Sequence, residues 1–148
     1  MNIVNSMKLS FLSKSVNESF ARAAVAAFLL PLDPTVAEVA DVKTAVSEAV
    51  TNAIVHGYPD RFGTVSIDMK LTDTGKAIIR ISDKGVGIPD IEKAMEPLFT
   101  TSSDERAGLG FAVMQSFMDR VKVRSSPGRG TTVTLEKNII RAHIKPVG

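Results

Sequence analysis

The chain has 148 residues, of which 44% are hydrophobic and 23% charged, a balance that fits one globular domain with its own core. It has no cysteine and two histidines, which excludes disulfides and thiolate metal sites and leaves too few ligands for a histidine-rich metal site. The net charge of +2 comes from 18 basic and 16 acidic residues without a long block of one sign, so nucleic acid is not an expected partner.

The apolar runs of the chain are too short to span a bilayer. The longest, residues 23–32, is broken by Pro31 and falls short of the roughly 20 residues that a membrane helix needs. Lys8 and Lys14 interrupt the N-terminal segment, so it lacks the form of an export signal. These features predict a cytoplasmic protein without a membrane partner.

The first half of the chain predicts one strand and two helices. Residues 7–14 alternate weakly and indicate a short strand. A helix follows, with Ser15 and Glu18 in the spacing of a capping box and Pro31 at its end. A second helix is predicted over residues 34–56, with Gly57 as the residue that ends it.

The second half predicts two hairpins around another helix. Strict alternation over residues 64–71 and a turn at 73–75 indicate the first hairpin, whose second strand covers 75–83. Residues 83–110 look like a long loop with a short helical piece, which is typical of functional or disordered segments. The remaining elements are a helix at 111–121 and strands at 121–126 and 131–137.

This order predicts the fold class. Strand pairs bracket helices instead of alternating singly with them, which favours an α+β fold: a two-layer sandwich with a mixed, mostly antiparallel sheet and its helices on one face. We expect one domain over residues 1–148, with 137–148 as a flexible tail.

Three polar residues interrupt the apolar second helix at one-turn intervals. Glu48, Asn52 and His56 project from the edge of its apolar face. A buried amide without a partner costs about 1–3 kcal/mol, and a buried carboxylate costs more. The row must therefore find partners, face a wet cleft or form an ordinary exposed stripe, and the helix alone does not decide between the last two.

Two glycine-containing segments are candidate ligand sites. Asp83, Gly85 and Gly87 follow a predicted strand. There glycine allows the backbone to approach a ligand closely, and aspartate can accept a hydrogen bond from an amino group such as that of adenine. A plain turn would have the same composition. Gly108 and Gly110 precede the predicted helix at 111–121, an arrangement that suits phosphate although a flexible helix entry would look alike.

Two further residues could complete such a site. Arg106 could reach a terminal phosphate, and Thr131 begins the last strand with a free hydroxyl, although either could be an ordinary surface or strand residue. A carboxylate, an oxygen ligand for a hard cation and two glycine segments are the parts that phosphoryl transfer from a nucleotide requires.

Taken in order, these motifs resemble the ATP-binding fold shared by gyrase, the Hsp90 chaperones, histidine kinases and MutL, known as the GHKL or Bergerat fold. The stretches "VSEAVTNAIVHGY", "GVGIPDIEKAMEPLFTT", "GLGFAVMQSFMD" and "GTTV" look most like the bacterial anti-sigma factor kinases. The resemblance covers residues 7–137 and implies a sheet of four or five strands with helices on one face.

The resemblance also implies roles for individual residues and the use of ATP or ADP with Mg²⁺. Asn52 would bind Mg²⁺, Glu48 would be the general base, and Asp83 would recognise adenine with help from Thr131. Arg106 would contact the γ-phosphate. The glycines that would shape the pocket and its lid are Gly85, Gly87, Gly108 and Gly110.

For partners, the resemblance implies a sigma factor of the sporulation type, held away from RNA polymerase, and an anti-anti-sigma protein phosphorylated on serine. It also implies a homodimer and a docking role for Arg22. From its spacing alone, Arg22 would form only a surface ion pair with Glu18.

The sequence leaves several alternatives open. They are a general stress-response type of anti-sigma serine kinase, a non-catalytic ATP-dependent binding module, a fragment of a sensor histidine kinase, and an ATP-driven clamp. The histidine kinase needs an acceptor histidine on a separate helical hairpin, where neither His56 nor His143 is placed. The clamp needs a second domain.

Overall fold

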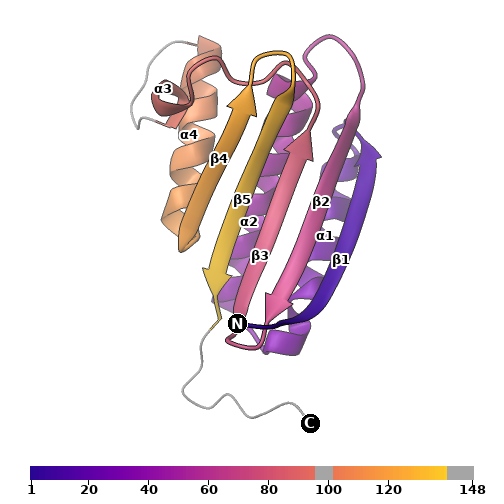
Figure 1. Cartoon of the computed structure of the whole chain (residues 1–148), viewed down its shortest axis with the longest axis vertical. Coiled ribbons are helices and arrows are strands. Elements are labelled where there is room, and N and C mark those ends of the chain that lie inside the picture. The colour runs from indigo at the N-terminus through magenta and orange to yellow at the C-terminus, as the bar shows by residue number, and fades with distance from the viewer. Residues whose placement is uncertain (96–101, 140–148) are drawn as a thin grey trace.

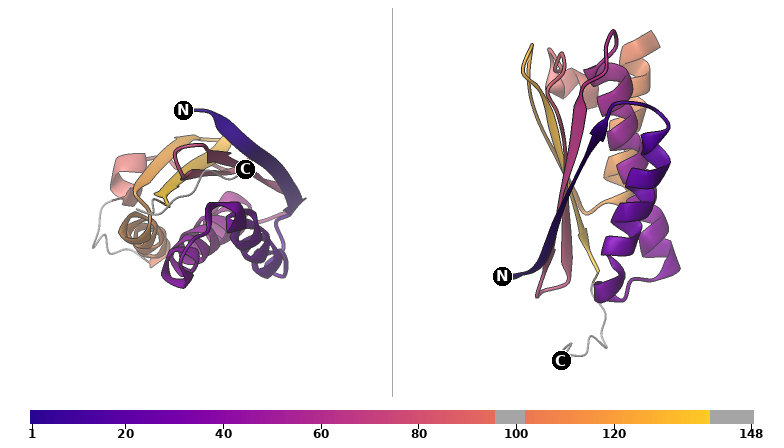
Figure 2. Two further views of the ribbon diagram at one scale, coloured as in Figure 1. Left: turned by 90° about the horizontal axis from the view of Figure 1, so that it is seen from below. Right: turned by 90° about the vertical axis from the view of Figure 1, so that its right-hand side faces the viewer.

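The computed structural model describes residues 1–95 and 102–139, with only the backbone described for Lys93 and for 102–109. A five-stranded sheet forms one layer and the long helices form the other (Figures 1 and 2). All the long helices lie on the same face of the sheet, which leaves the opposite face uncovered by helix.

The sheet consists of five strands in the order β1-β2-β3-β5-β4. Every neighbouring pair in that order is antiparallel. The predicted α+β two-layer fold is therefore confirmed, and the sheet of the described residues is antiparallel throughout instead of mixed. The strands are β1 (Ile3–Leu12), β2 (Thr64–Thr72), β3 (Lys76–Asp83), β4 (Arg120–Ser126) and β5 (Gly130–Asn138).

Two helices separate β1 from β2. Helix α1 (Asn17–Phe28) is followed by a 3-10 turn, Leu30–Leu32, and then by α2 (Val36–Asn52). The last turn of the predicted second helix is not α-helical, because Ala53–Gly57 form a π turn. The short α3 (Ile91–Met95) and the longer α4 (Ser102–Phe117) lie between β3 and β4.

The helix starts differ from the predicted capping pattern. Ser15 does not cap α1, which begins after Val16 without a side-chain cap. The Glu18 N–H donates to the Ser15 carbonyl at 3.2 Å instead of to its hydroxyl, and the Glu18 carboxylate accepts a hydrogen bond from Ser47. The capping box occurs on α2. The Thr35 hydroxyl oxygen accepts from the Glu38 N–H at 3.0 Å, and the Glu38 carboxylate accepts from the Thr35 N–H at 2.8 Å.

The core lies between the two layers and follows the predicted periodicities. On β2, every second residue from Val65 to Leu71 is buried, as strict alternation predicts. On α2 the apolar stripe packs against the sheet, with α1 and α4 as its neighbouring helices. Its buried members are Val42, Ala45, Val46, Ala49 and Val50.

Several boundaries differ from the sequence prediction. Strand β1 begins at Ile3, four residues early, because β2 is long enough to pair with it as far as Thr72. Helix α4 begins at Ser102 instead of 111, so the predicted long loop is much shorter. Strand β5 runs to Asn138 and Ile139 is buried, while residues 140–148 of the predicted tail lie outside the described residues.

The described helices include none that is both long and apolar enough to cross a membrane.

Candidate functional site

The end of α2 is held against the end of β3. After the π turn, the hydroxyl of Tyr58 donates a hydrogen bond to the Thr64 carbonyl at 2.8 Å and accepts one from the Lys84 N–H at 2.7 Å. Tyr58 itself is buried. π turns occur frequently at functional sites, and here the turn places His56 and Gly57 beside the strand ends.

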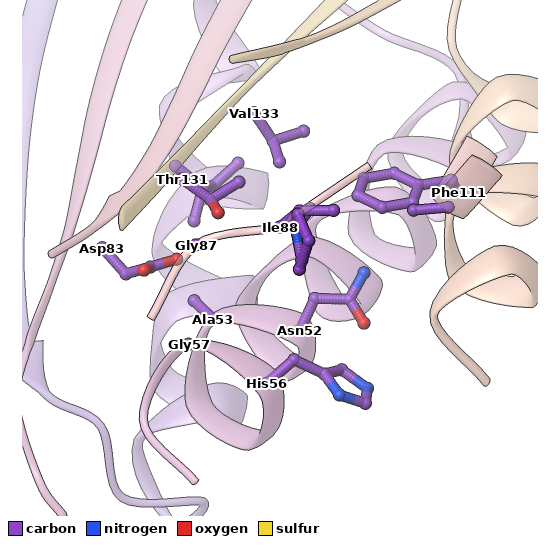
Figure 3. A pocket seen from close by; sticks show the side chains of 14 residues that line it. Asn52, Ala53, His56, Gly57, Asp83, Gly87, Ile88, Phe111, Thr131 and Val133 are labelled. Atoms are coloured by element: carbon purple, nitrogen blue, oxygen red, sulfur yellow. The ribbon is translucent and has the colours of Figure 1, made fainter. Parts of the chain in front are cut away.

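A cavity of about 190 Å³ opens between the end of α2, strands β3 and β5, and α4 (Figure 3). Asp83, Gly87 and Thr131 lie on its sheet side, and Asn52 and His56 lie on its helix side. Apolar side chains form most of the remaining wall. The lining residues are Ala49, Asn52, Ala53, His56, Gly57, Ile81, Asp83, Gly87, Ile88, Pro89, Ala94, Phe111, Thr131 and Val133.

Asp83 is the buried carboxylate of this pocket, with 7% of its surface exposed. Its Oδ1 accepts a hydrogen bond from the Gly85 N–H at 2.9 Å. Burial raises the pKa of Asp83 above its usual value, while the N–H groups of Gly85 and Thr131 act in the opposite direction. A carboxylate has about four acceptor positions, so these two donors leave capacity for a ligand's N–H.

Two glycines allow the backbone to close around Asp83. A Cβ on Gly57 would lie 2.9 Å from Cγ and Oδ1 of Asp83, and a Cβ on Gly85 would lie 1.8 Å from the Gly57 carbonyl oxygen. That carbonyl accepts a hydrogen bond from the Val86 N–H at 2.9 Å. Gly85 therefore lets its backbone approach the π turn closely, whereas the approach to a ligand predicted from the sequence stays a prediction.

The rim beside Asp83 is built by the β4–β5 turn. Gly87 has a φ of 78°, and a Cβ there would lie 2.2 Å from the Ser126 carbonyl oxygen. The Ser125 hydroxyl is 2.8 Å from the Thr131 hydroxyl and accepts a hydrogen bond from the Ile88 N–H at 2.7 Å. These contacts fix the segment after β3 against the last two strands, which places Gly87 and Thr131 on the same wall.

Glu48 and Asn52 meet α4 at Gly110. A Cβ on Gly110 would lie 3.2 Å from Oε2 of Glu48 and 3.1 Å from Nδ2 of Asn52, so both polar ends point at the same place on α4. Nδ2 of Asn52 is buried and has no hydrogen-bond partner among the described residues. Such atoms are rare in folded proteins and cost about 1–3 kcal/mol, which suggests that this amide is kept for a ligand.

The structure assembles most of the predicted site. Asn52, Asp83, Gly87 and Thr131 line one cavity although they come from three distant parts of the sequence. Gly85 lies directly behind Asp83. Glu48 does not line the cavity itself but lies one helical turn from Asn52, at the Gly110 contact.

The predicted glycine-rich helix entry is wrong. Gly108 and Gly110 lie within α4, which begins at Ser102, so they do not present free N–H groups at a helix start. Gly110 instead allows α4 to approach the Glu48–Asn52 row. The Arg106 side chain and the surroundings of Gly108 lie outside the described residues.

Arg22 lies apart from the pocket. It is on α1, which contributes no lining residue, and its guanidinium is 3.5 Å from the Glu18 carboxylate. This is the ion pair that the spacing alone predicts, although the Glu18 side chain is only 16% exposed and the pair is therefore partly buried.

The sequence did not identify the apolar walls of the pocket. Ile81 and Val133 belong to the inward face of the strands, which the alternation could have revealed. Phe111 comes from α4 and is 1% exposed, and its role depends on helix packing that no local pattern specifies. His56, whose role the sequence left open, lines the pocket through the π turn.

The raised pKa of Asp83 predicts a specific pH dependence of stability. The folded chain keeps this proton at pH values where the unfolded chain, with a pKa of 3.8, has lost it. The contribution of Asp83 to stability is therefore greatest below about pH 3.8 and falls as the pH rises through the folded pKa. Chemical unfolding of the wild type and of Asp83→Asn across this range should show wild type losing stability relative to the variant as the pH rises. A constant difference would contradict the burial effect.

Residues 13–137 match the family model described as "Histidine kinase-like ATPase domain". The chain is similar to the "Anti-sigma F factor" of Thermoanaerobacter sp. (strain X514), at 57% identity over 140 residues that cover 94% of this chain and 97% of the relative. It is also similar to the "Anti-sigma F factor" of Clostridium acetobutylicum, at 55% identity over 90% of this chain and 93% of the relative.

Solved structures share the fold at low identity. A structure of the RsbU and RsbW domains of a Mycobacterium tuberculosis protein matches 92% of this chain and 32% of its own, with a TM-score of 0.67 and 18% identity. A histidine kinase domain of the Erythrobacter litoralis blue-light activated histidine kinase matches 82% of this chain and 60% of its own, with a TM-score of 0.54 and 17% identity.

Proposed function

We propose that this chain, which belongs to the anti-sigma F factor family within the histidine-kinase-like ATPase domains, is an ATP-dependent protein serine kinase that also binds a sigma factor. The observation that carries the nucleotide site is the convergence of Asn52, Asp83 and Thr131 on one cavity. The membership in the anti-sigma F family carries the choice of protein partners.

Asp83 and Thr131 would hold the adenine base. The buried carboxylate retains acceptor capacity for the adenine amino group, and the Thr131 hydroxyl lies on the same wall. The cavity is smaller than the roughly 300–1,000 Å³ of pockets that enclose a whole drug-sized ligand. We infer that it takes the base, and that the phosphates extend toward Asn52, Glu48 and α4.

Asn52 would hold Mg²⁺ together with phosphate oxygens. The fit rests on its amide, whose Nδ2 has no partner among the described residues, because an amide with nothing bound to it is available to a ligand. Which amide atom is oxygen follows from the hydrogen-bond network, so an unpartnered amide can present either end. Bound Mg²⁺ would neutralise charge that develops on the phosphates during transfer.

Glu48 would act as the general base. Its carboxylate lies beside Asn52 and accepts no hydrogen bond from the described residues that would occupy it. It would take the proton from the serine hydroxyl of the protein substrate as that oxygen bonds to the γ-phosphorus, while the bond to the ADP oxygen breaks and ADP leaves. Gly110 keeps α4 from covering the carboxylate with a side chain.

The protein partners follow from the family. We propose a sigma F-like sigma factor as the protein that is sequestered, and an anti-anti-sigma factor as the serine substrate. Arg22, whose side chain is 39% exposed and lies outside the nucleotide pocket, would dock these partners from α1.

One assay separates the parts of this proposal. The purified chain is incubated with Mg²⁺-ATP, a sigma F-like factor and candidate anti-anti-sigma proteins, and sigma binding, nucleotide binding and acid-stable phosphoserine are measured separately. We expect all three. Nucleotide and sigma binding without phosphotransfer would indicate a non-catalytic binding module, and acid-labile phosphate on the chain itself would indicate a histidine kinase.

A homodimer is part of the same proposal, and strand β1 offers it a surface. β1 is an edge strand with exposed apolar side chains, among them Val4 at 59% exposure and Met7 at 52%. Unprotected apolar edges are where strands of two chains pair. Val4→Lys should therefore shift the chain toward monomer in sedimentation experiments, whereas the same change at Val36, which is 88% exposed at the start of α2, should leave the assembly intact. Equal behaviour of both variants would exclude β1 as the contact.

A further inference from the structure

The face of the sheet opposite the helices carries a shallow hollow of about 770 Å³. Residues from all five strands line it, and none of them lines the nucleotide pocket. Because side chains alternate along each strand, Ile81 and Asp83 point toward the helices while Arg80 and Ser82 point into this hollow. The two surfaces are thus on opposite sides of one sheet.

Positive charge dominates the hollow. Its two carboxylates are already paired, Asp68 with Lys8 at 3.6 Å and Glu136 with Lys76 at 3.2 Å. The remaining cations are all exposed, and within residues 1–95 and 102–139 they have no ion-pair partner. These cations are Lys70, Arg80, Arg120, Lys122 and Arg124.

The spacing of the cations is regular. Arg120, Lys122 and Arg124 occupy alternate positions of β4, so their side chains leave the sheet at intervals of about 6.6 Å. Thr134 of β5 pairs with Lys122 of β4 on one side and with Arg80 of β3 on the other. Arg80 therefore lies level with Lys122, the middle cation of β4. A polypeptide in extended conformation repeats its side chains at the same interval.

We infer that this face is a docking surface for an acidic segment of a partner protein, bound in extended conformation with Asp or Glu at alternate positions. Its carboxylates would meet the cations of β4 and Arg80, and the hydroxyls of Thr132 and Thr134 would provide further hydrogen-bond donors. This interaction goes beyond the proposed kinase and nucleotide functions, which use the other side of the sheet.

The composition of the face favours a protein over the other anionic occupants. None of the described residues that line the hollow is aromatic, so they cannot provide the stacking that holds single-stranded nucleic acid. A second copy of this chain placed face to face would oppose cations to cations, which is unfavourable. The hollow's own carboxylates, Asp68 and Glu136, would repel the acidic side chains of the segment. This repulsion would help to fix the register in which the segment binds.

The test uses the full chain and a short labelled peptide of alternating Glu and Gly, with a Gln and Gly peptide as its uncharged counterpart. Fluorescence anisotropy at low ionic strength compares wild type with the double variant Arg80→Gln/Lys122→Gln. The control, Lys14→Gln/Lys43→Gln, removes the same charge from positions outside the hollow and away from the β4–β5 turn.

We expect the Glu peptide to bind wild type and the control alike, and the patch variant to bind about three- to thirtyfold more weakly, as expected for two lost exposed ion pairs. Added salt should weaken binding to wild type more than to the patch variant. Nucleotide affinity should be unchanged in both variants. A loss of peptide binding can therefore be distinguished from a loss of nucleotide binding.

Three results would overturn the inference. One is equal loss of peptide binding in the patch and control variants. Another is tighter binding of a single-stranded oligonucleotide or of anionic vesicles, lost in the patch variant, which would assign the face to nucleic acid or membrane. The third is a change of oligomeric state in the patch variant alone, which would make the face an interface between copies.

Discussion

Replacing Glu48 with Gln is expected to lower the rate of phosphotransfer to the anti-anti-sigma protein by about 10²–10⁴-fold, the range that general-base catalysis contributes. Glutamine keeps the size of the side chain and one acceptor oxygen, but its other oxygen is replaced by an NH₂ group, so the side chain cannot accept the hydroxyl proton. Because the cavity that takes the base and the Asn52 side chain are unchanged, and glutamine fills the same space, nucleotide affinity and sigma-factor binding should change little. Initial rates of phosphoserine formation at saturating ATP, beside equilibrium nucleotide binding, measure the two effects separately.

Asp41→Asn provides the matched control for Glu48→Gln. Asp41 lies on the same helix, is partly exposed and pairs with Lys137 at 3.3 Å, far from the nucleotide pocket. Its neutralisation should leave phosphotransfer within a factor of about two, because Asp41 lines no part of the nucleotide pocket and distant sites act independently. Undiminished transfer by Glu48→Gln would remove Glu48 from the role of base. If Glu48→Gln also lost nucleotide affinity, the Glu48 carboxylate of the wild type would be a ligand of the nucleotide instead of the base that takes the proton.

Gly85→Ala is expected to have the largest effect on the pocket itself. The added methyl group would lie 1.8 Å from the carbonyl oxygen of Gly57, and that neighbour is backbone, which cannot rotate away. Either the π turn or the end of β3 must move, and each movement displaces the Asp83 carboxylate. We expect a loss of about 3 kcal/mol in the free energy of unfolding, at the upper end of the usual cost of overpacking, and loss of measurable nucleotide binding.

Gly128→Ala separates this clash from a general effect of replacing glycine. Gly128 lies in the β4–β5 turn with a φ of 75°, and a Cβ there would meet nothing within 4 Å. Its replacement costs only the strain of a left-handed residue, about 1–2 kcal/mol. Thermal unfolding and nucleotide titration of both variants test the comparison. If Gly85→Ala bound nucleotide as well as Gly128→Ala, the contact between Gly57 and Gly85 would not control the pocket.

The sequence predicted the elements whose signals are local. The alternation of β2 and the apolar stripe of α2 each identify a buried face without knowledge of the rest of the chain. The polar row of Glu48 and Asn52 was visible for the same reason, because a polar residue on an otherwise apolar helix needs a partner or a cleft. Asp83 at a strand end was visible as a candidate, but its burial depends on Gly57, which is 26 residues earlier in the sequence.

The features that the sequence missed depend on contacts between distant segments. Gly108 and Gly110 favour a helix entry by composition, since glycine is a poor helix former, yet α4 continues through them and uses Gly110 to pack against α2. The capping box expected between Ser15 and Glu18 did not form, because the Glu18 carboxylate is held by Ser47 on α2 and the Glu18 N–H donates to the Ser15 carbonyl. In both cases tertiary packing overrides a local preference of a few tenths of a kcal/mol to about 1 kcal/mol.

The π turn at Ala53–Gly57 gives the chain a spare residue beside its pocket. Each residue of a regular α-helix advances the chain by 1.5 Å and rotates it by about 100°. A π turn contains one residue more than an α-helical turn, so this extra residue does not change the orientation of the helix before it. Loss of a single codon from this stretch could therefore leave a continuous α-helix, with its apolar stripe still correctly placed. Gly57 would then no longer pack against the Asp83 carboxylate. The core of such a protein would be intact, but its nucleotide pocket would be lost. A deletion here separates folding from function more cleanly than any deletion inside α2 itself.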